Sequence, residues 1–150
     1  MPVREIVCPK VSGVYMLGEL KHRYNRRSES WSCGFSYYIG QSEDVAQRFV
    51  AHRSPKSKLN LCDCRMLLLS EVPLRAAQRS RLELLERKFI NAALEMKLPL
   101  RNTQLVREWW PDLEEEKTIL TEAIATFREL AATEWKKHTG ICSGINTVAA

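Results

Sequence analysis

The stretch from Ser36 to His52 constrains the fold of this chain more than any other part of the sequence. It begins with an apolar and aromatic run over residues 37–39, whose residue types favour a β-strand, and Gly40 ends that run. Ser42 then stands where a helix N-cap would, and the two acidic residues that follow it suit the positive end of a helix. This order predicts a short strand that leads directly into a helix over residues 42–53.

One face of this predicted helix combines apolar and basic side chains. With a helical period of about 3.6 residues, four residues fall within about a third of its circumference. A guanidinium and an imidazole on a buried stripe are costly unless an anionic group meets them. The pattern therefore indicates a site where an anion meets this face, which carries Val45, Arg48, Phe49 and His52.

The composition is that of a single soluble domain. At 150 residues the chain can bury a core large enough to need no disulfide or structural metal. No apolar run approaches the roughly 20 residues of a membrane span, and no signal peptide opens the sequence. Five cysteines, an odd number without secretory context, favour reduced thiols. We therefore expect one domain over residues 1–150, in the cytoplasm and without a membrane partner.

The net charge of +5 is unevenly distributed along the chain. Residues 1–111 hold 19 Lys and Arg against 11 Asp and Glu, a balance of +8, whereas residues 112–150 hold 4 against 7, a balance of −3. The first part therefore suits a polyanionic partner such as nucleic acid. Charge alone leaves this interpretation level with a basic surface that only meets solvent.

Three apolar runs predict β-strands over residues 11–17, 35–39 and 65–71, and the last is apolar enough for a central, buried position. Residues 18–34 are polar, basic and irregular, and we interpret them as an inserted loop or a loose hairpin. Basic residues interleaved with aromatic ones suit contact with phosphates and bases, and a solvated loop is an equal alternative.

The long helix predicted over residues 74–96, directly after Pro73, carries a carboxylate on its apolar face. Glu86 lies about 40° from the centre of that face and is flanked by Leu82 and Phe89. A carboxylate in the middle of an apolar stripe must be paired, protonated or bound to a cation. Glu86 is therefore a candidate metal ligand or ion-pair partner.

A last helix is predicted from Pro111 to about Lys137, with acidic residues in its first turn. Its apolar stripe runs from Leu113 to Trp135 and is expected to pack on the rest of the domain, while a homodimer interface on this stripe stays open. The Trp109–Trp110 pair before the helix is expected to serve as a hydrophobic anchor.

Two short motifs and four single residues follow one another in an order that points to one family. The first strand contains Gly-Val-Tyr at 13–15, and the second contains Tyr-Ile-Gly at 38–40. Over residues 11–103 the chain resembles the GIY-YIG nucleases, although the stretches between the two motifs and between the last two single residues are longer than is usual. The single residues are Arg48, His52, Glu86 and Asn102.

The resemblance implies an α+β fold, in which a small three-stranded antiparallel sheet is flanked by helices. Residues 11–103 would form this core, and residues 111–138 would add a C-terminal helical extension. Members of the family cleave phosphodiester bonds with a divalent cation, commonly Mg²⁺, with Mn²⁺ as an alternative. The three strands and the helices predicted above are compatible with this fold.

The resemblance also assigns roles to the site residues, and their chemistry is compatible with these roles. Glu86 offers the hard oxygen that Mg²⁺ prefers, and Arg48 offers a planar fork that matches phosphate oxygens. Tyr15 corresponds to the tyrosine that orients or deprotonates the attacking water, and its pKa of about 10 would have to be lowered for work as a base. Tyr38 would position phosphate or water, and His52 would hydrogen-bond Tyr15 or the phosphate. Asn102 would hold the site together by hydrogen bonds.

The sequence therefore predicts a metal-dependent endonuclease that acts on DNA. Two alternatives stay open: a module of the same fold that binds nucleic acid without cutting it, and an interaction protein whose C-terminal helix docks a partner. Contacts to nucleic acid are expected from the basic stretches before the second strand and after the first helix. The residues are Lys21, Arg23, Arg26, Arg27, Arg53, Lys56 and Lys58.

Overall fold

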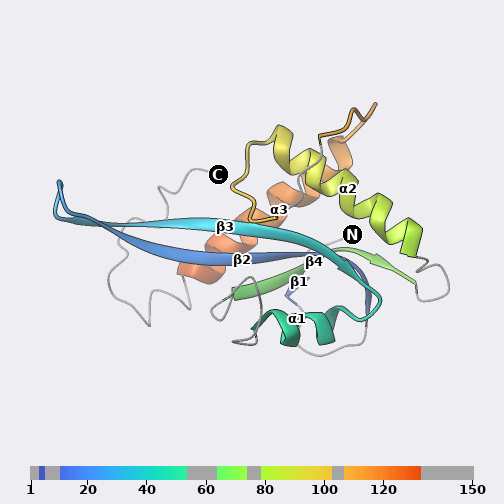
Figure 1. Cartoon of the computed structure of the whole chain (residues 1–150), viewed down its shortest axis with the longest axis horizontal. Helices are drawn as coiled ribbons and strands as arrows, with labels where there is room; N and C mark the ends of the chain where they lie inside the picture. The colour runs from blue at the N-terminus through green and yellow to red at the C-terminus, as the bar shows by residue number, and fades with distance from the viewer. Residues whose placement is uncertain (1–3, 6–10, 54–63, 74–78, 103–106, 133–150) are drawn as a thin grey trace.

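The computed structural model describes residues 4–5, 11–53, 64–73, 79–102 and 107–132. They form an antiparallel sheet with one helix on one face and two helices on the other (Figure 1). No helix in these ranges combines the length and the apolar character needed to cross a membrane. In chain order the elements are β1 (Arg4–Glu5), β2 (Ser12–Asn25), β3 (Ser30–Ser42), α1 (Val45–Arg53), β4 (Cys64–Val72), α2 (Arg79–Glu95) and α3 (Glu114–Leu130).

The sheet has the strand order β1-β4-β2-β3, and every neighbouring pair is antiparallel. Its three long strands confirm the predicted α+β class with a three-stranded antiparallel sheet, to which β1 adds two residues at one edge. β4 lies between β1 and β2 and is largely buried, as its apolar run predicted. β3 forms the other edge of the sheet.

β2 and β3 are much longer than the predicted strands, because they pair with each other continuously between residues 13 and 42. The interpretation of residues 18–34 as an inserted loop is therefore wrong, and the hairpin there is regular rather than loose. The cross-strand ladder holds polar and charged residues whose own preference for strands is weak. Residues 26–29 make the turn, in which the backbone N–H of Arg27 donates to Asn25 Oδ1 at 2.9 Å.

Successive side chains of the strands point to opposite faces of the sheet and build two cores. The larger core lies between the sheet and the helices α2 and α3, and includes Met16, Ile39, Leu67, Phe89 and Phe127. The smaller core lies between the sheet and α1, and includes Tyr15, Leu17, Val45, Met66 and Leu68.

α3 packs on the sheet through Phe127, which is fully buried. Its ring lies 5.8 Å from that of Tyr37 and 6.4 Å from that of Phe35. A Cβ on Gly18 would lie 2.6 Å from the Phe127 ring, so β2 needs a glycine where the helix crosses it. The predicted packing of the C-terminal stripe is confirmed as far as Ala131, and Trp135 lies outside the described residues.

α1 begins at Val45, not at residue 42 as predicted. Ser42 still belongs to β3, where its Oγ accepts a hydrogen bond from the backbone N–H of Asp44 at 3.0 Å. Asp44 Oδ1 in turn accepts from the backbone N–H of Gln47 at 3.1 Å. The cap of this helix is therefore Asp44, because the ladder with β2 keeps Ser42 extended.

Candidate active site

The two motif tyrosines meet where β2 and β3 pair. Tyr15 lies directly opposite Gly40 in the ladder, and its ring centroid lies 6.4 Å from that of Tyr38. A Cβ on Gly40 would lie 2.4 Å from the Tyr15 hydroxyl, so only glycine leaves room for this phenol. The second motif therefore supplies both a tyrosine and the space that its partner occupies.

Tyr15 is buried, with 1% of its surface exposed. Burial raises the pKa of its phenol well above the ordinary value, and the neighbouring Tyr38 and Glu86 raise it further. A hydrogen bond with the Arg48 side chain and the charge of that side chain oppose this rise without cancelling it. Tyr15 is therefore a neutral phenol at neutral pH, and it makes a hydrogen bond with the Arg48 side chain.

Tyr38 is half-buried on the same face of the sheet. Burial raises the pKa of its phenol, the carboxylate of Glu86 raises it further, and Arg48 lowers it. The same glutamate and the same arginine thus act on both tyrosines, although α1 and α2 supply them from opposite faces of the sheet. The structure therefore brings Tyr15, Tyr38, Arg48 and Glu86 together.

Arg48 is exposed, which corrects the expectation that it lies on a buried stripe. Val45 is fully buried and Phe49 is half-buried, so the apolar part of that face does pack on the sheet. The long arginine side chain lets its head approach Tyr15 while much of it stays in solvent. His52 belongs to α1, but its side chain lies outside the described part of the structure.

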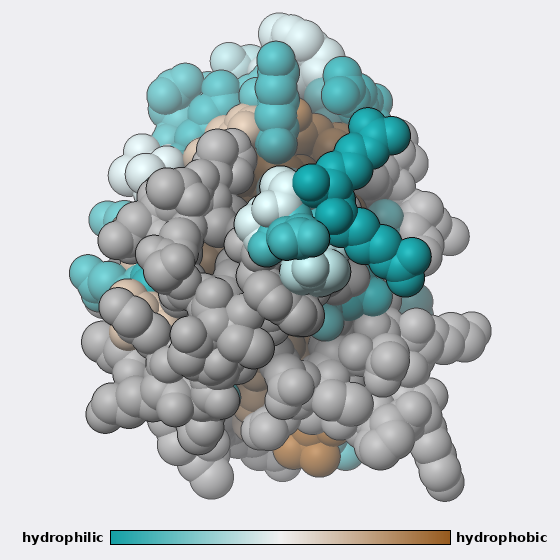
Figure 2. All heavy atoms as spheres, turned by 90° about the vertical axis from the view of Figure 1, so that its left-hand side faces the viewer, coloured by the Kyte–Doolittle hydropathy of each residue, from teal (hydrophilic) through white to brown (hydrophobic). Residues whose placement is uncertain are grey.

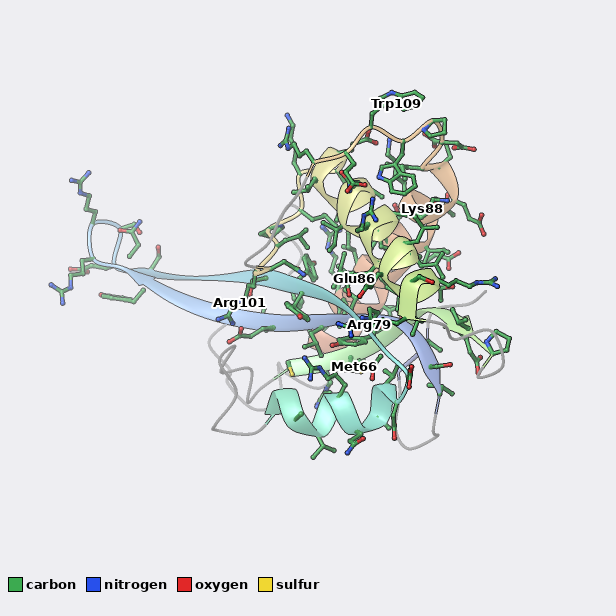
Figure 3. The ribbon with its side chains drawn as sticks, turned by 45° about the vertical axis from the view of Figure 1, so that its right-hand side comes forward. Met66, Arg79, Glu86, Lys88, Arg101 and Trp109 are labelled. Carbon is green, nitrogen blue, oxygen red and sulfur yellow. The ribbon has the colours of Figure 1, made fainter. Side chains whose placement is uncertain are left out.

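Glu86 lies on α2 and is half-buried (Figure 3). Burial raises the pKa of its carboxyl, and the nearby Glu83 raises it further. Among the described residues it makes no hydrogen bond and no ion pair. The ion-pair interpretation is therefore not supported, and a half-buried carboxylate is left near the phenols of Tyr15 and Tyr38.

This arrangement fits a hard divalent cation. Within the described ranges no group of three His, Cys, Asp or Glu side chains is placed to hold one metal ion together, so the protein would supply few ligands. Mg²⁺ accepts such a site, because it usually keeps several of its waters. A cation at Glu86 would also reverse the local electrostatics and lower the pKa values of Glu86, Tyr15 and Tyr38.

Two hollows flank the site, and Gln41 borders both of them. The first, of about 360 Å³, is lined by Ser42, Glu43, Arg48, Arg79 and Leu82. The second, of about 320 Å³, is lined by Glu83, Glu86, Arg87, Ile90, Asn91 and Glu108. Arginines outnumber carboxylates in the first hollow and carboxylates outnumber arginines in the second, so the first hollow is basic and the second is acidic.

Gln41 and Arg79 were not among the predicted site residues. Gln41 directly follows the second motif. Arg79 stands seven residues before Glu86, and this spacing places Arg79 and Glu86 on one side of α2. Arg79 Nε donates to Glu83 Oε1 at 3.0 Å, and its side chain is 86% exposed. Such a surface pair contributes little to stability, so Arg79 can turn towards an anion in the first hollow.

Asn102 fastens the chain after α2 to the free edge of β3. Its Oδ1 accepts from the backbone N–H of Ile39 at 3.1 Å, and its Nδ2 donates to the carbonyl of Ile39 at 2.8 Å. The carbonyl of Pro99 accepts from Tyr37 N–H at 2.9 Å, and Arg101 N–H donates to the Tyr37 carbonyl at 2.6 Å. Asn102 therefore holds the motif strand in place, and these bonds occupy its amide.

A network of polar contacts fixes the wall that α2 contributes. Arg87 makes two hydrogen bonds with the carboxylate of Glu108, at 3.0 and 2.8 Å, and Lys88 pairs with the buried Glu116 at 2.9 Å. Lys88 also lies over the half-buried ring of Trp110, 5.9 Å from its centroid. Trp110 is the predicted anchor, whereas the same prediction is wrong for Trp109, which is 85% exposed.

Two of the basic residues predicted to contact nucleic acid, Arg26 and Arg27, lie at the far end of the hairpin and apart from this site. Arg26 and Arg27 are exposed in the turn between β2 and β3. Lys21, Arg23 and Arg53 belong to described strands or helices, but their side chains are not described. Lys56 and Lys58 lie outside the described residues.

Comparison of the chain with models of known families, with curated proteins and with solved structures returned no match. The class of protein therefore rests on the fold and the site. They define an α+β protein whose tyrosine, arginine and glutamate side chains converge beside the edge of an antiparallel sheet.

Proposed function

We propose that this protein is a cytoplasmic, metal-dependent endonuclease of the GIY-YIG type, which hydrolyses phosphodiester bonds in DNA. One observation carries the proposal: Glu86, without an ionic partner among the described residues, and Arg48 act on the same two tyrosines from opposite sides. Phosphodiester hydrolysis needs a cation, an oriented water and positive charge at the phosphate. The acidic hollow would suit the cation and the basic hollow would suit the phosphate, which supports the proposal.

A bound Mg²⁺ or Mn²⁺ would supply a nucleophilic water and stabilise negative charge. Glu86 is the residue that would hold it, with Glu83 as its nearest acidic neighbour. Arg48 and Arg79 would bind the phosphate oxygens from the basic hollow. The half-exposed Tyr38 would orient water or phosphate through its hydroxyl, and the neutral Tyr15 would position Arg48.

The test is cleavage of supercoiled plasmid in the presence of Mg²⁺. We expect wild type to nick the plasmid and Glu86→Gln to lose at least about a hundredfold in rate, because the amide keeps the shape of the side chain and loses its charge. Arg79→Ala should lose less, about three- to tenfold, because it would contact the substrate from an exposed position.

Glu95→Gln is the matched control for this experiment. Glu95 lies on the same helix, but it pairs with Lys117 at 2.8 Å on the α3 side. We expect its variant to cut at the wild-type rate. If wild type never nicks DNA, or if Glu86→Gln cuts as fast as wild type, the endonuclease proposal is wrong.

The buried, neutral Tyr15 favours one alternative, a module that binds nucleic acid without cutting it. Binding measured at low salt separates the two functions, because phosphate contacts are strongest there. A wild type that binds plasmid tightly and never cuts it would support the binding module. A wild type that does neither would exclude both.

A further inference from the structure

The far half of the β2–β3 hairpin leaves the body of the protein. β2 pairs with β4 only as far as Glu19, and Leu20 and Phe35 are the last residues of the hairpin that belong to the core. Beyond them residues 21–34 form a two-stranded ribbon with its turn at 26–29, which we call the arm. Figure 1 shows the arm projecting away from the helices and from β4.

Nothing in the described structure supports the arm from either face. A two-stranded ribbon without a third strand or a helix is only marginally stable in water. The arm carries four Lys and Arg against one Glu, a net charge of +3. Its described residues 24–30 are all exposed, and Figure 2, seen from the side to which the arm points, shows strongly hydrophilic side chains nearest the viewer.

The shape and charge of the arm suit one class of partner. A two-stranded ribbon has the width that enters the major groove of B-form DNA, and arginines at its tip can contact phosphates on either side of the groove. Tyr24, which is 49% exposed, adds an aromatic ring next to these charges.

The outer edge of β3 runs from the site to the arm, and residues 99–102 cover part of this edge beside Tyr37 and Ile39. Ten residues separate Gly40 from Ser30, which at about 3.3 Å per residue is about 33 Å, or one turn of about 10 base pairs in B-form DNA. Arg101 lies at the base of the arm, where it pairs with Glu19, and Figure 3 places it between Glu86 and the arm. A duplex along this edge would meet both ends of the same strand.

We propose that the arm is a second DNA contact, which enters the major groove about one helical turn from the phosphate held at the site. This inference rests on the proposed function, since it takes the site to hold a DNA phosphate. It names the substrate class more narrowly, as a DNA duplex long enough to reach the arm.

The experiment measures binding, so that it does not depend on cleavage. Glu86→Gln, which keeps the fold and is not expected to cut, is titrated with labelled DNA duplexes of about 6 and about 24 base pairs, which lie below and above one helical turn. The arm variant adds Arg26→Ala and Arg27→Ala to this background. The control adds Arg81→Ala and Arg107→Ala, two exposed residues outside the arm, which remove the same charge.

We expect the arm variant to bind the long duplex about tenfold more weakly than Glu86→Gln alone at low salt. Its plot of log K against log salt should be less steep, by about 2 units of slope. The short duplex should bind all three proteins with equal affinity. On the long duplex the control should lose less affinity than the arm variant. A long RNA duplex should show no arm effect, because the A-form major groove is too deep and narrow for the ribbon.

Equal losses on short and long duplexes, or equal losses in the arm variant and the control, would overturn the proposal. An arm effect of the same size on RNA would overturn entry into the major groove. The outcome is separate from that of the plasmid test. If wild type does not cut plasmid and the arm effect appears, endonuclease activity fails alone, and if wild type cuts and the effect is missing, the arm fails alone.

Discussion

The two ends of the β2–β3 hairpin belong to one hydrogen-bonded ladder, but they differ in the helices and strands that cover them. At the site end, near Tyr15 and Gly40, α1, α2 and β4 enclose the pair of strands, and the phenol fits a space that a methyl group would fill. At the arm end, no other described strand or helix covers residues 21–34. The comparison shows that strand pairing sets the length of the hairpin, whereas the covering layers decide where it is rigid enough to hold a reacting group.

The largest expected effect concerns the helix that covers the base of the hairpin. Phe127→Ala should lower the free energy of unfolding by about 3–5 kcal/mol, because it leaves a cavity against Phe35, Tyr37 and Gly18. Trp109→Ala removes an exposed ring and should change it by less than about 0.5 kcal/mol. Denaturant unfolding measures both, and similar losses for the two variants would mean that α3 does not support the hairpin.

An intermediate effect compares one substitution at the two ends of the ladder. Gly40→Ala should cost about 1–3 kcal/mol, because its Cβ would stand 2.4 Å from the Tyr15 hydroxyl. Gly34→Ala, in the arm, meets nothing within 4 Å and should be neutral or slightly stabilising. Thermal unfolding of the two variants measures this difference. Equal shifts in Tm would contradict the close fit of Tyr15 against the second motif.

The smallest expected effect is the cost of keeping Glu86 charged. Its pKa is higher in the folded chain than in the unfolded chain, so its contribution to the free energy of unfolding is present at acid pH and falls as pH rises from about 4.5 through the raised pKa. Without divalent cations, Glu86→Gln should therefore unfold at a slightly higher temperature than wild type at pH 7. The difference in the free energy of unfolding should be less than about 1 kcal/mol, because the site is partly open to solvent. At pH 4 the two should unfold at nearly the same temperature.

Adding Mg²⁺ to the same thermal unfolding experiment tests whether Glu86 holds the cation. Because a ligand that binds only the folded state stabilises it, Mg²⁺ at pH 7 should raise the Tm of wild type and leave that of Glu86→Gln unchanged. A variant that is less stable than wild type at pH 7 in the absence of Mg²⁺ would show that Glu86 has a stabilising partner instead of a desolvated charge.

Local patterns in the sequence named most of the side chains that the structure brings together. The spacing of Arg48 and Glu86 on amphipathic helices and the two tyrosines in apolar runs were visible without coordinates, as was the α+β class. The exposure of Arg48 was not predictable in this way, because helical periodicity shows which face a residue shares but not how far a neighbouring layer reaches over it. Gln41 and Arg79 were missed for a related reason, since only the packing of α2 beside β3 opens the hollow that they line.

The length of the hairpin was hidden for another reason. Residues 21–34 are polar and basic, with little intrinsic preference for strands, and their pairing depends on a partner strand that continues the ladder. The role of Asn102 was visible only as a general expectation of hydrogen bonding. Its two bonds to Ile39 depend on a parallel contact between segments more than sixty residues apart.

By itself the sequence determined the α+β class, the approximate places of three strands and of the helices, and which side chains are candidates for a site, because these follow from the local periods of strand and helix. Only the tertiary structure decided that Glu86 and Arg48 meet the same tyrosines from opposite faces, that Tyr15 is a neutral and buried phenol, and that the basic insertion is an arm. The physical reason is that burial, pKa and reach depend on contacts between layers, and those contacts join residues that no local pattern connects.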